Sequence, residues 1–99
     1  MNAVKIKIDP DLGEELVIGY FENRKKELSV LETFRINRDF ESIAKTAHKL
    51  KGTGLSYGFD EISKFGELLE KAAITKDLAS CETLMSQHQN YINNVILEE

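Results

Sequence analysis

The central stretch of the chain reads Ala47-His48-Lys49-Leu50-Lys51-Gly52-Thr53-Gly54-Leu55-Ser56-Tyr57-Gly58. No acidic residue occurs between positions 42 and 57, although the whole chain has a net charge of −4. Side chains three and four residues apart on a helix share a face, so a helical His48 would lie among lysines, with no side chain at Gly52 to cover it. A nucleophilic ring nitrogen, neighbouring cations and an open surface predict a site that accepts a phosphoryl group.

The apolar residues around His48 predict a helix from about Asp39 to Leu55. They recur at the spacing of one buried helical face, at Phe40, Ile43, Ala44, Ala47 and Leu50. At the helical rotation of about 100° per residue, His48 lies roughly 90° from the centre of this face, at the boundary between core and solvent. Gly52 and Gly54 each cost roughly 1 kcal/mol in a helix interior, which indicates that access to His48 is favoured over stability.

The rest of the chain predicts three more helices. Asp9-Pro10-Asp11 is typical of a helix start and predicts a helix from about Pro10 to Ile36, with a kink or a separate short opening helix at its glycines. A third helix begins at Phe59 or Asp60. A fourth follows the break at Thr75-Lys76-Asp77 and carries Val95 inward. We therefore predict an all-α fold, an up-down antiparallel four-helix bundle, in a single domain over residues 1–99.

The first residues of the chain alternate between apolar and basic side chains over Val4–Ile8. This alternation is compatible with a short extended arm. A single strand cannot pair with itself, however, so the fold prediction rests on the helices alone.

Composition excludes several classes of protein. A net charge of −4 argues against a general nucleic-acid-binding protein, which would have a broad basic surface. No apolar run is long enough to span a bilayer, and the start of the chain lacks the apolar core of a signal peptide, so we expect no membrane insertion and a cytoplasmic protein. The glycines fit neither a Walker loop nor a dinucleotide-binding fingerprint, so a nucleotide-dependent kinase is not expected.

The second histidine, His88, differs from His48 in its setting. It lies on the apolar face of the fourth predicted helix, between Met85 and Ile92, and we expect it to be buried and structural. A metal site built from the two histidines would need further ligands, and the sequence has neither a Glu-x-x-His pair nor a second cysteine, so no metal is expected. Cys81 lies on the same apolar face and is expected to be a small buried residue.

The residues alone leave two interpretations of His48 open. It is either a reactive imidazole or one surface histidine among the lysines of a solvated helix. A neutral histidine has one ring nitrogen with a free lone pair, and Lys51 is the cation best placed to meet a phosphoryl group on that nitrogen. Lys45 and Lys49 would instead steer an acidic partner toward the site. The alternative is a non-catalytic helical interaction module that binds a partner through the apolar segment Leu16–Phe21.

The order His48-x-Leu50-Lys51-Gly52, with Gly58 ten residues after His48, resembles the histidine-containing phosphotransfer (HPt) domain family. Asp9-Pro10-x-Leu12, Phe21-Glu22-Asn23-Arg24 and Asp39-Phe40 are also similar to members of that family, so the resemblance extends over essentially the whole chain. It implies a four-helix bundle that carries a phosphoryl group on a histidine and exchanges it with aspartates of response-regulator receiver domains, without binding ATP.

The resemblance also assigns roles to particular residues. It implies that His48 is phosphorylated, that Lys51 supports the phosphoryl group, that Gly52 gives the receiver access and that Gly58 shapes the following turn. The expected partners are a receiver domain, which supplies the Mg²⁺ so that this chain needs no cofactor, and a hybrid sensor histidine kinase. We expect a monomer. The residues expected to dock the partner are Leu12, Leu16, Ile18, Lys45 and Lys49.

Overall fold

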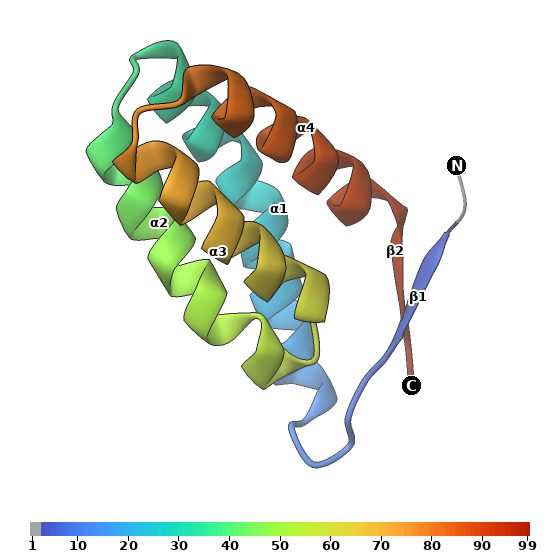
Figure 1. Cartoon of the computed structure of the whole chain (residues 1–99). Helices are drawn as coiled ribbons and strands as arrows, with labels where there is room; N and C mark the ends of the chain where they lie inside the picture. The colour runs from blue at the N-terminus through green and yellow to red at the C-terminus, as the bar shows by residue number, and fades with distance from the viewer. Residues whose placement is uncertain (1–2) are drawn as a thin grey trace.

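The helices form an up-down antiparallel bundle, as predicted. The computed structural model describes residues 3–99. Its elements, in chain order, are β1 (Val4–Lys7), α1 (Glu14–Ile36), α2 (Phe40–Thr53), the 3₁₀ turn η1 (Leu55–Tyr57), α3 (Asp60–Ile74), α4 (Leu78–Asn94) and β2 (Val95–Glu98). Figure 1 shows each helix running back along its predecessor, with both strands beside one end of the bundle. None of the helices over residues 3–99 has the length and apolar character needed to cross a membrane.

The predicted apolar faces build the core. On α2, Ile43, Ala47 and Leu50 are completely or almost completely buried. The opposing helices contribute residues at the same helical spacing, and the fully buried ones among them include Ile62, Leu69, Cys81 and Ile92. Burying side chains of this size stabilises a fold by about 1.5–3 kcal/mol each. The core therefore fixes which face of α2 remains in solvent.

Two similar turns close the same end of the bundle. Asp39 accepts a hydrogen bond from the backbone of Ser42 at 3.1 Å, and Asp77 accepts one from the backbone of Ser80 at the same distance. Hydrogen bonding to these serines lowers the pKa of both carboxyl groups. The residue before each cap has a positive φ, 53° at Arg38 and 55° at Lys76. These caps set where α2 and α4 begin.

The start of α1 differs from the prediction. The helix begins at Glu14 rather than Pro10, because Gly13 has a φ of 89° that a helix cannot contain. The Asp9 side chain accepts a hydrogen bond from the backbone of Asp11 at 2.9 Å, so it closes a turn instead of capping a helix. No separate opening helix forms among the described residues, and α1 continues through Gly19 without a break.

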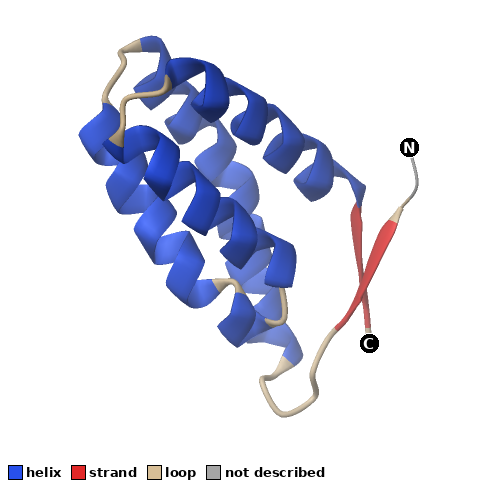
Figure 2. Cartoon of the chain, in the orientation of Figure 1, coloured by secondary structure: helices blue, strands red, loops and turns tan. Residues whose placement is uncertain are grey.

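The two ends of the described chain pair as strands, which the sequence analysis did not predict. β1 lies parallel to β2 with Val4 opposite Val95 and Ile6 opposite Leu97, and the Ile8 amide donates to the Glu98 carbonyl at 2.7 Å (Figure 2). The prediction that Val95 continues the last helix was therefore wrong, since this residue is already extended. The alternation at Val4–Ile8 did indicate a strand, and its partner lies at the opposite end of the sequence.

Two glycines allow α2 and α3 to approach one another closely. A Cβ on Gly66 would lie 2.4 Å from the Lys51 amide nitrogen and 2.6 Å from the Ala47 carbonyl oxygen. A Cβ on Gly54, just after α2, would lie 2.6 Å from the Ser63 amide nitrogen. Backbone atoms are the obstacle in each case, so a side chain at either position would force the two helices apart.

This contact predicts that Gly66→Ala destabilises the fold. We expect a loss of about 1–3 kcal/mol in the free energy of unfolding, because the added methyl group overpacks a backbone contact. Urea unfolding followed by circular dichroism measures it. Gly19→Ala is the matched control, since a Cβ there meets no atom within 4 Å, and it should stabilise the helix by about 0.5–1 kcal/mol. Equal shifts in the two variants would contradict the packing role of Gly66.

Candidate functional site

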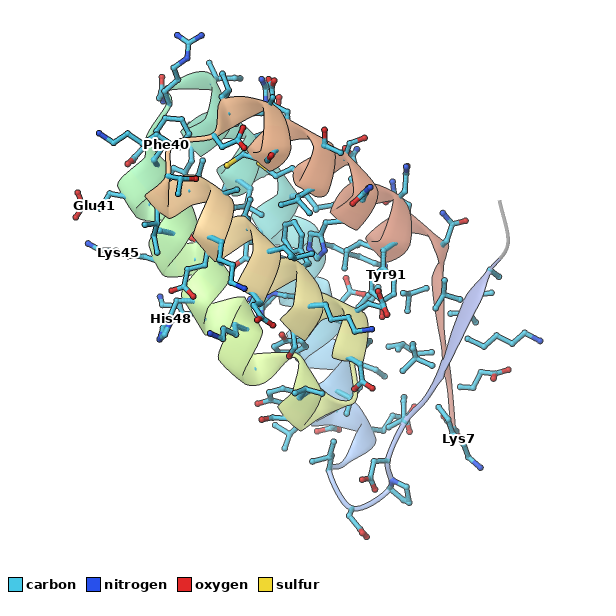
Figure 3. The ribbon with its side chains drawn as sticks, in the orientation of Figure 1. Lys7, Phe40, Glu41, Lys45, His48 and Tyr91 are labelled. Atoms are coloured by element: carbon cyan, nitrogen blue, oxygen red, sulfur yellow. The ribbon has the colours of Figure 1, made fainter. Side chains whose placement is uncertain are left out.

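His48 projects from the outward face of α2. Its side chain is 72% exposed, although its neighbours Ala47 and Leu50 are buried. Figure 3 shows His48 and Lys45 on the side of α2 that faces away from the bundle. The predicted position at the edge of the buried face thus leaves the ring open to an approaching molecule.

A carboxylate from the next helix orients the His48 ring. Glu70 of α3 lies with its Oε2 atom 2.9 Å from His48 Nδ1, and its own side chain is only 21% exposed. An ionised carboxylate accepts hydrogen bonds and cannot donate them, so Nδ1 carries the proton in this pair. The lone pair then lies on Nε2, the nitrogen that Glu70 leaves unoccupied.

Glu70 is the site residue that sequence reasoning missed. The absence of acids between positions 42 and 57 describes the sequence near His48 correctly but not its surroundings in space, because α3 supplies the carboxylate. The available signal was its spacing of four residues from Gly66, which places both on the face of α3 that meets α2. However, Gly66 can be recognised as the point where α2 and α3 meet only when the alignment of these two helices is known.

Lys51 lies near the other oxygen atom of the same carboxylate. Its Nζ atom is 3.9 Å from Glu70 Oε1, and half of its side chain remains exposed. The other two lysines interact with other acidic residues. Lys45 pairs with Glu41 at 3.2 Å. Lys49 lies on the side of α1, where it and Arg24 oppose the rise in the pKa of Glu27 that burial causes. Lys51 is therefore the lysine that the structure places with His48 and Glu70.

The two glycines after His48 have different surroundings. Gly52 is open, since an added Cβ would have no neighbouring atom within 4 Å. Gly54 is buried against Ser63 and Phe59, so the interpretation of Gly54 as an access glycine was wrong. Gly58 has a φ of 89° and ends the turn η1. Only Gly52 leaves a bare surface beside the histidine.

The aromatic contacts beside Gly52 hold α1 against α2. The Tyr20 hydroxyl donates a hydrogen bond to Thr53 Oγ1 at 2.8 Å. The Thr53 hydroxyl in turn donates one to the Lys49 carbonyl at 2.9 Å. The Tyr20 ring stacks on Tyr57 with 4.3 Å between ring centroids. These contacts place the first half of α1 next to the C-terminal half of α2.

The predicted apolar docking residues in and just before α1 do not share one surface. Leu16 is 63% exposed, and it lies one turn before Tyr20 on the side that faces α2. Ile18 is 38% exposed but lies two residues on, on nearly the opposite side of the helix. Leu12 is partly buried against the core. Leu55, which was not predicted, is 62% exposed beside the site helix.

His88 occupies an interior position, as expected. It is 3% exposed and stacks on Phe65 with 3.9 Å between ring centroids. Burial lowers its pKa to about 4, and the nearby Arg24 cation adds to this effect. Cys81 is also buried, which raises the pKa of its thiol. Over residues 3–99, no three histidine, cysteine or acidic side chains gather as a group that could hold a metal ion.

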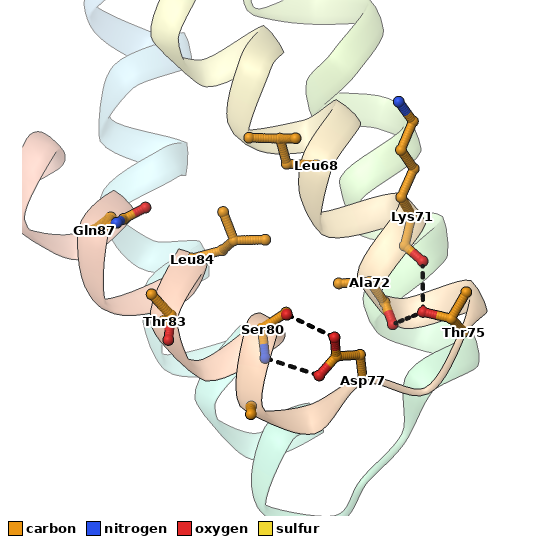
Figure 4. A pocket seen from close by; sticks show the side chains of 10 residues that line it. Leu68, Lys71, Ala72, Thr75, Asp77, Ser80, Thr83, Leu84 and Gln87 are labelled. Atoms are coloured by element: carbon orange, nitrogen blue, oxygen red, sulfur yellow. Dashed lines mark hydrogen bonds between the residues drawn. The ribbon is translucent and has the colours of Figure 1, made fainter.

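A surface groove between α3 and α4 lacks the features of a reactive site. Leu68, Ala72 and Leu84 contribute its apolar lining. Figure 4 shows that the polar groups at one end of the groove hydrogen-bond locally, since Asp77 accepts from the amide and hydroxyl of Ser80 and the Thr75 hydroxyl donates to backbone carbonyls. The groove contains no histidine, so the chemistry is assigned to the face of α2.

Fold and site together define a class of small helical bundles that present one carboxylate-oriented histidine from the middle of a helix. The Hpt domain model matches residues 15–97, nearly the whole chain, and the chain belongs to this family. Hpt domains are histidine phosphotransfer modules of two-component systems, and they act as phosphocarriers rather than kinases. No curated protein and no solved structure gives a significant match. Strand β1 lies outside the matched residues.

The Glu70 contact predicts the tautomer of His48. In the unmodified protein we expect the Nδ1–H form to dominate, because the carboxylate accepts that proton. Glu70→Ala should shift the population toward Nε2–H, which long-range ¹H–¹⁵N correlation spectra detect directly. Glu67→Ala is the control, since Glu67 lies on the same helix but pairs with Lys71. A tautomer population that Glu70→Ala leaves unchanged would remove the orienting role of Glu70.

His88 predicts a loss of stability in mild acid. Its folded pKa of about 4 lies below the ordinary 6.5, so the unfolded chain binds a proton first as the pH falls. The stabilisation is complete above pH 6.5 and is lost between about pH 6.5 and 4. From pH 7 to pH 5 the wild type should lose about 2 kcal/mol more unfolding free energy than His88→Leu.

Urea unfolding at the two pH values measures this difference, and His48→Gln serves as the control that retains His88. The same pH dependence in His88→Leu as in the wild type would show that other groups cause the acid sensitivity.

Proposed function

We propose that this chain carries a phosphoryl group on Nε2 of His48 and exchanges it with the aspartate of a response-regulator receiver domain. The observation that carries this proposal is the 2.9 Å contact between Glu70 and His48 Nδ1 on a ring that is 72% exposed. This contact holds His48 in the Nδ1–H tautomer and leaves its Nε2 atom free as a nucleophile. A histidine with no chemical role needs neither.

The transfer step follows from this arrangement. The Nε2 lone pair attacks the phosphorus of an aspartyl phosphate, the N–P bond forms, and the P–O bond to the aspartate breaks and returns a carboxylate. The ring gains positive charge because both nitrogens are then substituted. Glu70 lies against the Nδ1–H group and stabilises that charge electrostatically. Reversal of the same step returns the phosphoryl group to a receiver.

Lys51 and Gly52 support the step in different ways. The Lys51 ammonium lies on the same side of α2 as Glu70, and a phosphoryl group on His48 would offer it a second anionic partner. Gly52 leaves the surface beside the ring bare, so the loop that carries the receiver aspartate can approach. The Mg²⁺ that such transfer requires belongs to the receiver in this proposal, and this chain supplies no cofactor.

The proposed docking surface surrounds the site. Leu16 and Leu55 are exposed apolar residues near it, since Leu16 lies one turn before Tyr20 and Leu55 follows the end of α2 by two residues. Lys45 and Lys49 add positive charge that would attract the acidic site of a receiver. We propose a hybrid sensor histidine kinase as the upstream source of the phosphoryl group and the cytoplasm as the place of exchange.

The decisive experiment uses His48→Gln. The wild type, incubated with the small phosphodonor phosphoramidate, should gain one phosphoryl group that is stable in base and labile in acid, as intact mass spectrometry detects. His48→Gln should gain none, and His88→Gln should still be labelled. Equal labelling of wild type and His48→Gln would refute the site.

A second outcome has its own interpretation. If the wild type gains no phosphoryl group from phosphoramidate or from any phosphorylated receiver in a panel, the phosphocarrier proposal fails. The chain would then act as a non-catalytic interaction module.

We predict that Lys51→Ala slows transfer without abolishing it. Removing one charge-assisted contact to the phosphoryl group costs about 1.5–3 kcal/mol, which corresponds to a slowing of roughly ten- to a hundredfold. Single-turnover transfer from a phosphorylated receiver measures the rate. Lys45→Ala is the control, because it also removes one positive charge, but one that lies farther from the phosphoryl group. Salt screens such distant charges, so this variant should change the transfer rate mainly at low ionic strength. Equal single-turnover rates for Lys51→Ala and wild type would exclude the assigned role.

A further inference from the structure

The strand pair is an incomplete sheet. β1 and β2 pair only with each other among residues 3–99, and their parallel arrangement leaves a backbone edge free on each side. One face carries four partly buried residues, Val4, Ile6, Val95 and Leu97, and the last three of them pack against the core. The other face is exposed. Parallel strands are usually covered on both faces, and sheets of two strands are only marginally stable alone.

The two free edges differ in character. The exposed side chains of β1 are Lys5 and Lys7, and lysine on an edge strand discourages pairing with another strand. The exposed side chains of β2 are Ile96, which is 47% exposed at the middle of the strand, and Glu98 at its end. With one apolar and one charged exposed side chain, the edge of β2 is therefore less protected against a further strand than the edge of β1, which carries two lysines.

We propose that β2 pairs antiparallel with β2 of a second copy of this chain, which makes the protein a dimer instead of the monomer expected from the sequence. A twofold axis at Ile96 would place the two Ile96 side chains opposite each other and Val95 opposite Leu97 of the other copy. Glu98 would have no partner in the strand of the other copy, because the opposite residue, Asn94, ends α4, so this register places no like charges directly opposite each other. The result is a four-stranded sheet with the lysine-bearing β1 strands at its two outer edges.

The other pairings between copies are less favourable. A β1–β1 pair centred on Ile6 would place Lys5 opposite Lys7, and like charges directly opposite destabilise a sheet. A β1–β2 pair between copies is a head-to-tail contact and would continue into a ring or an open array. Only the twofold β2 pair closes with two copies while it covers Ile96.

The proposed dimer leaves the histidine sites free. Figure 3 shows His48 on α2, on the opposite side of the molecule from the strands. Two such sites on one dimer would make it bivalent toward receivers. The pairing itself rests on the strand edges and would stand if the proposed phosphotransfer failed, since oligomeric state is measured without any phosphodonor.

Analytical ultracentrifugation of the full chain over micromolar to millimolar concentrations tests the proposal. We expect a mass that rises from 11.3 kDa toward twice that value. Ile96→Lys should weaken the dimer by about tenfold or more, because it removes the apolar contact at the axis and adds like charges there.

Val30→Lys is the matched control. Val30 is 46% exposed on α1, and its substitution should leave dimerisation unchanged. Circular dichroism of both variants checks that the fold persists. In the wild type, amide hydrogen exchange in Val95–Glu98 should slow as concentration rises.

A wild type that stays monomeric up to millimolar concentration would overturn the proposal, and so would equal dimerisation of the two variants. A Val95–Glu98 exchange rate independent of concentration would also overturn it.

Discussion

The close approach of α2 and α3 is the constraint on which the site depends. At Gly66 the backbones meet so closely that a Cβ would lie 2.4 Å from the Lys51 amide nitrogen. Glu70 lies one turn farther along α3 on the same face, so the contact that admits Gly66 also brings the Glu70 carboxylate within 2.9 Å of His48. The packing at Gly66 thus sets the position of the carboxylate that contacts His48.

The three lysines near His48 in the sequence differ in how close they lie to its ring in the structure. Three lysines are near it in sequence, but only Lys51 shares a carboxylate with it in the structure. Lys45 and Lys49 face acids of their own, Glu41 and Glu27. A partner surface would meet the ring together with one close cation, while the remaining positive charge acts at longer range.

The features that could be predicted from the sequence depend on neighbours along the chain. Helical spacing identified the core faces, the exposure of His48 and the burial of His88, because a single helix determines each of these. Glu70 could not be predicted, since its role depends on how two helices align. Gly54 was misjudged for the same reason, because an open glycine and a glycine pressed against Ser63 look identical in sequence. The strand pair joins residues more than ninety positions apart.

The parallel direction of those strands has a mechanical consequence. The described chain enters the sheet at Val4 and leaves it at Glu98, and Figure 1 shows these ends pointing in opposite directions. A force that pulls the ends apart would therefore load all the hydrogen bonds between β1 and β2 at once, in shear, instead of opening them one by one. Unfolding under such a force is governed by the rate of crossing this barrier. The strands would thereby shield the histidine-bearing helix from tension carried through the polypeptide.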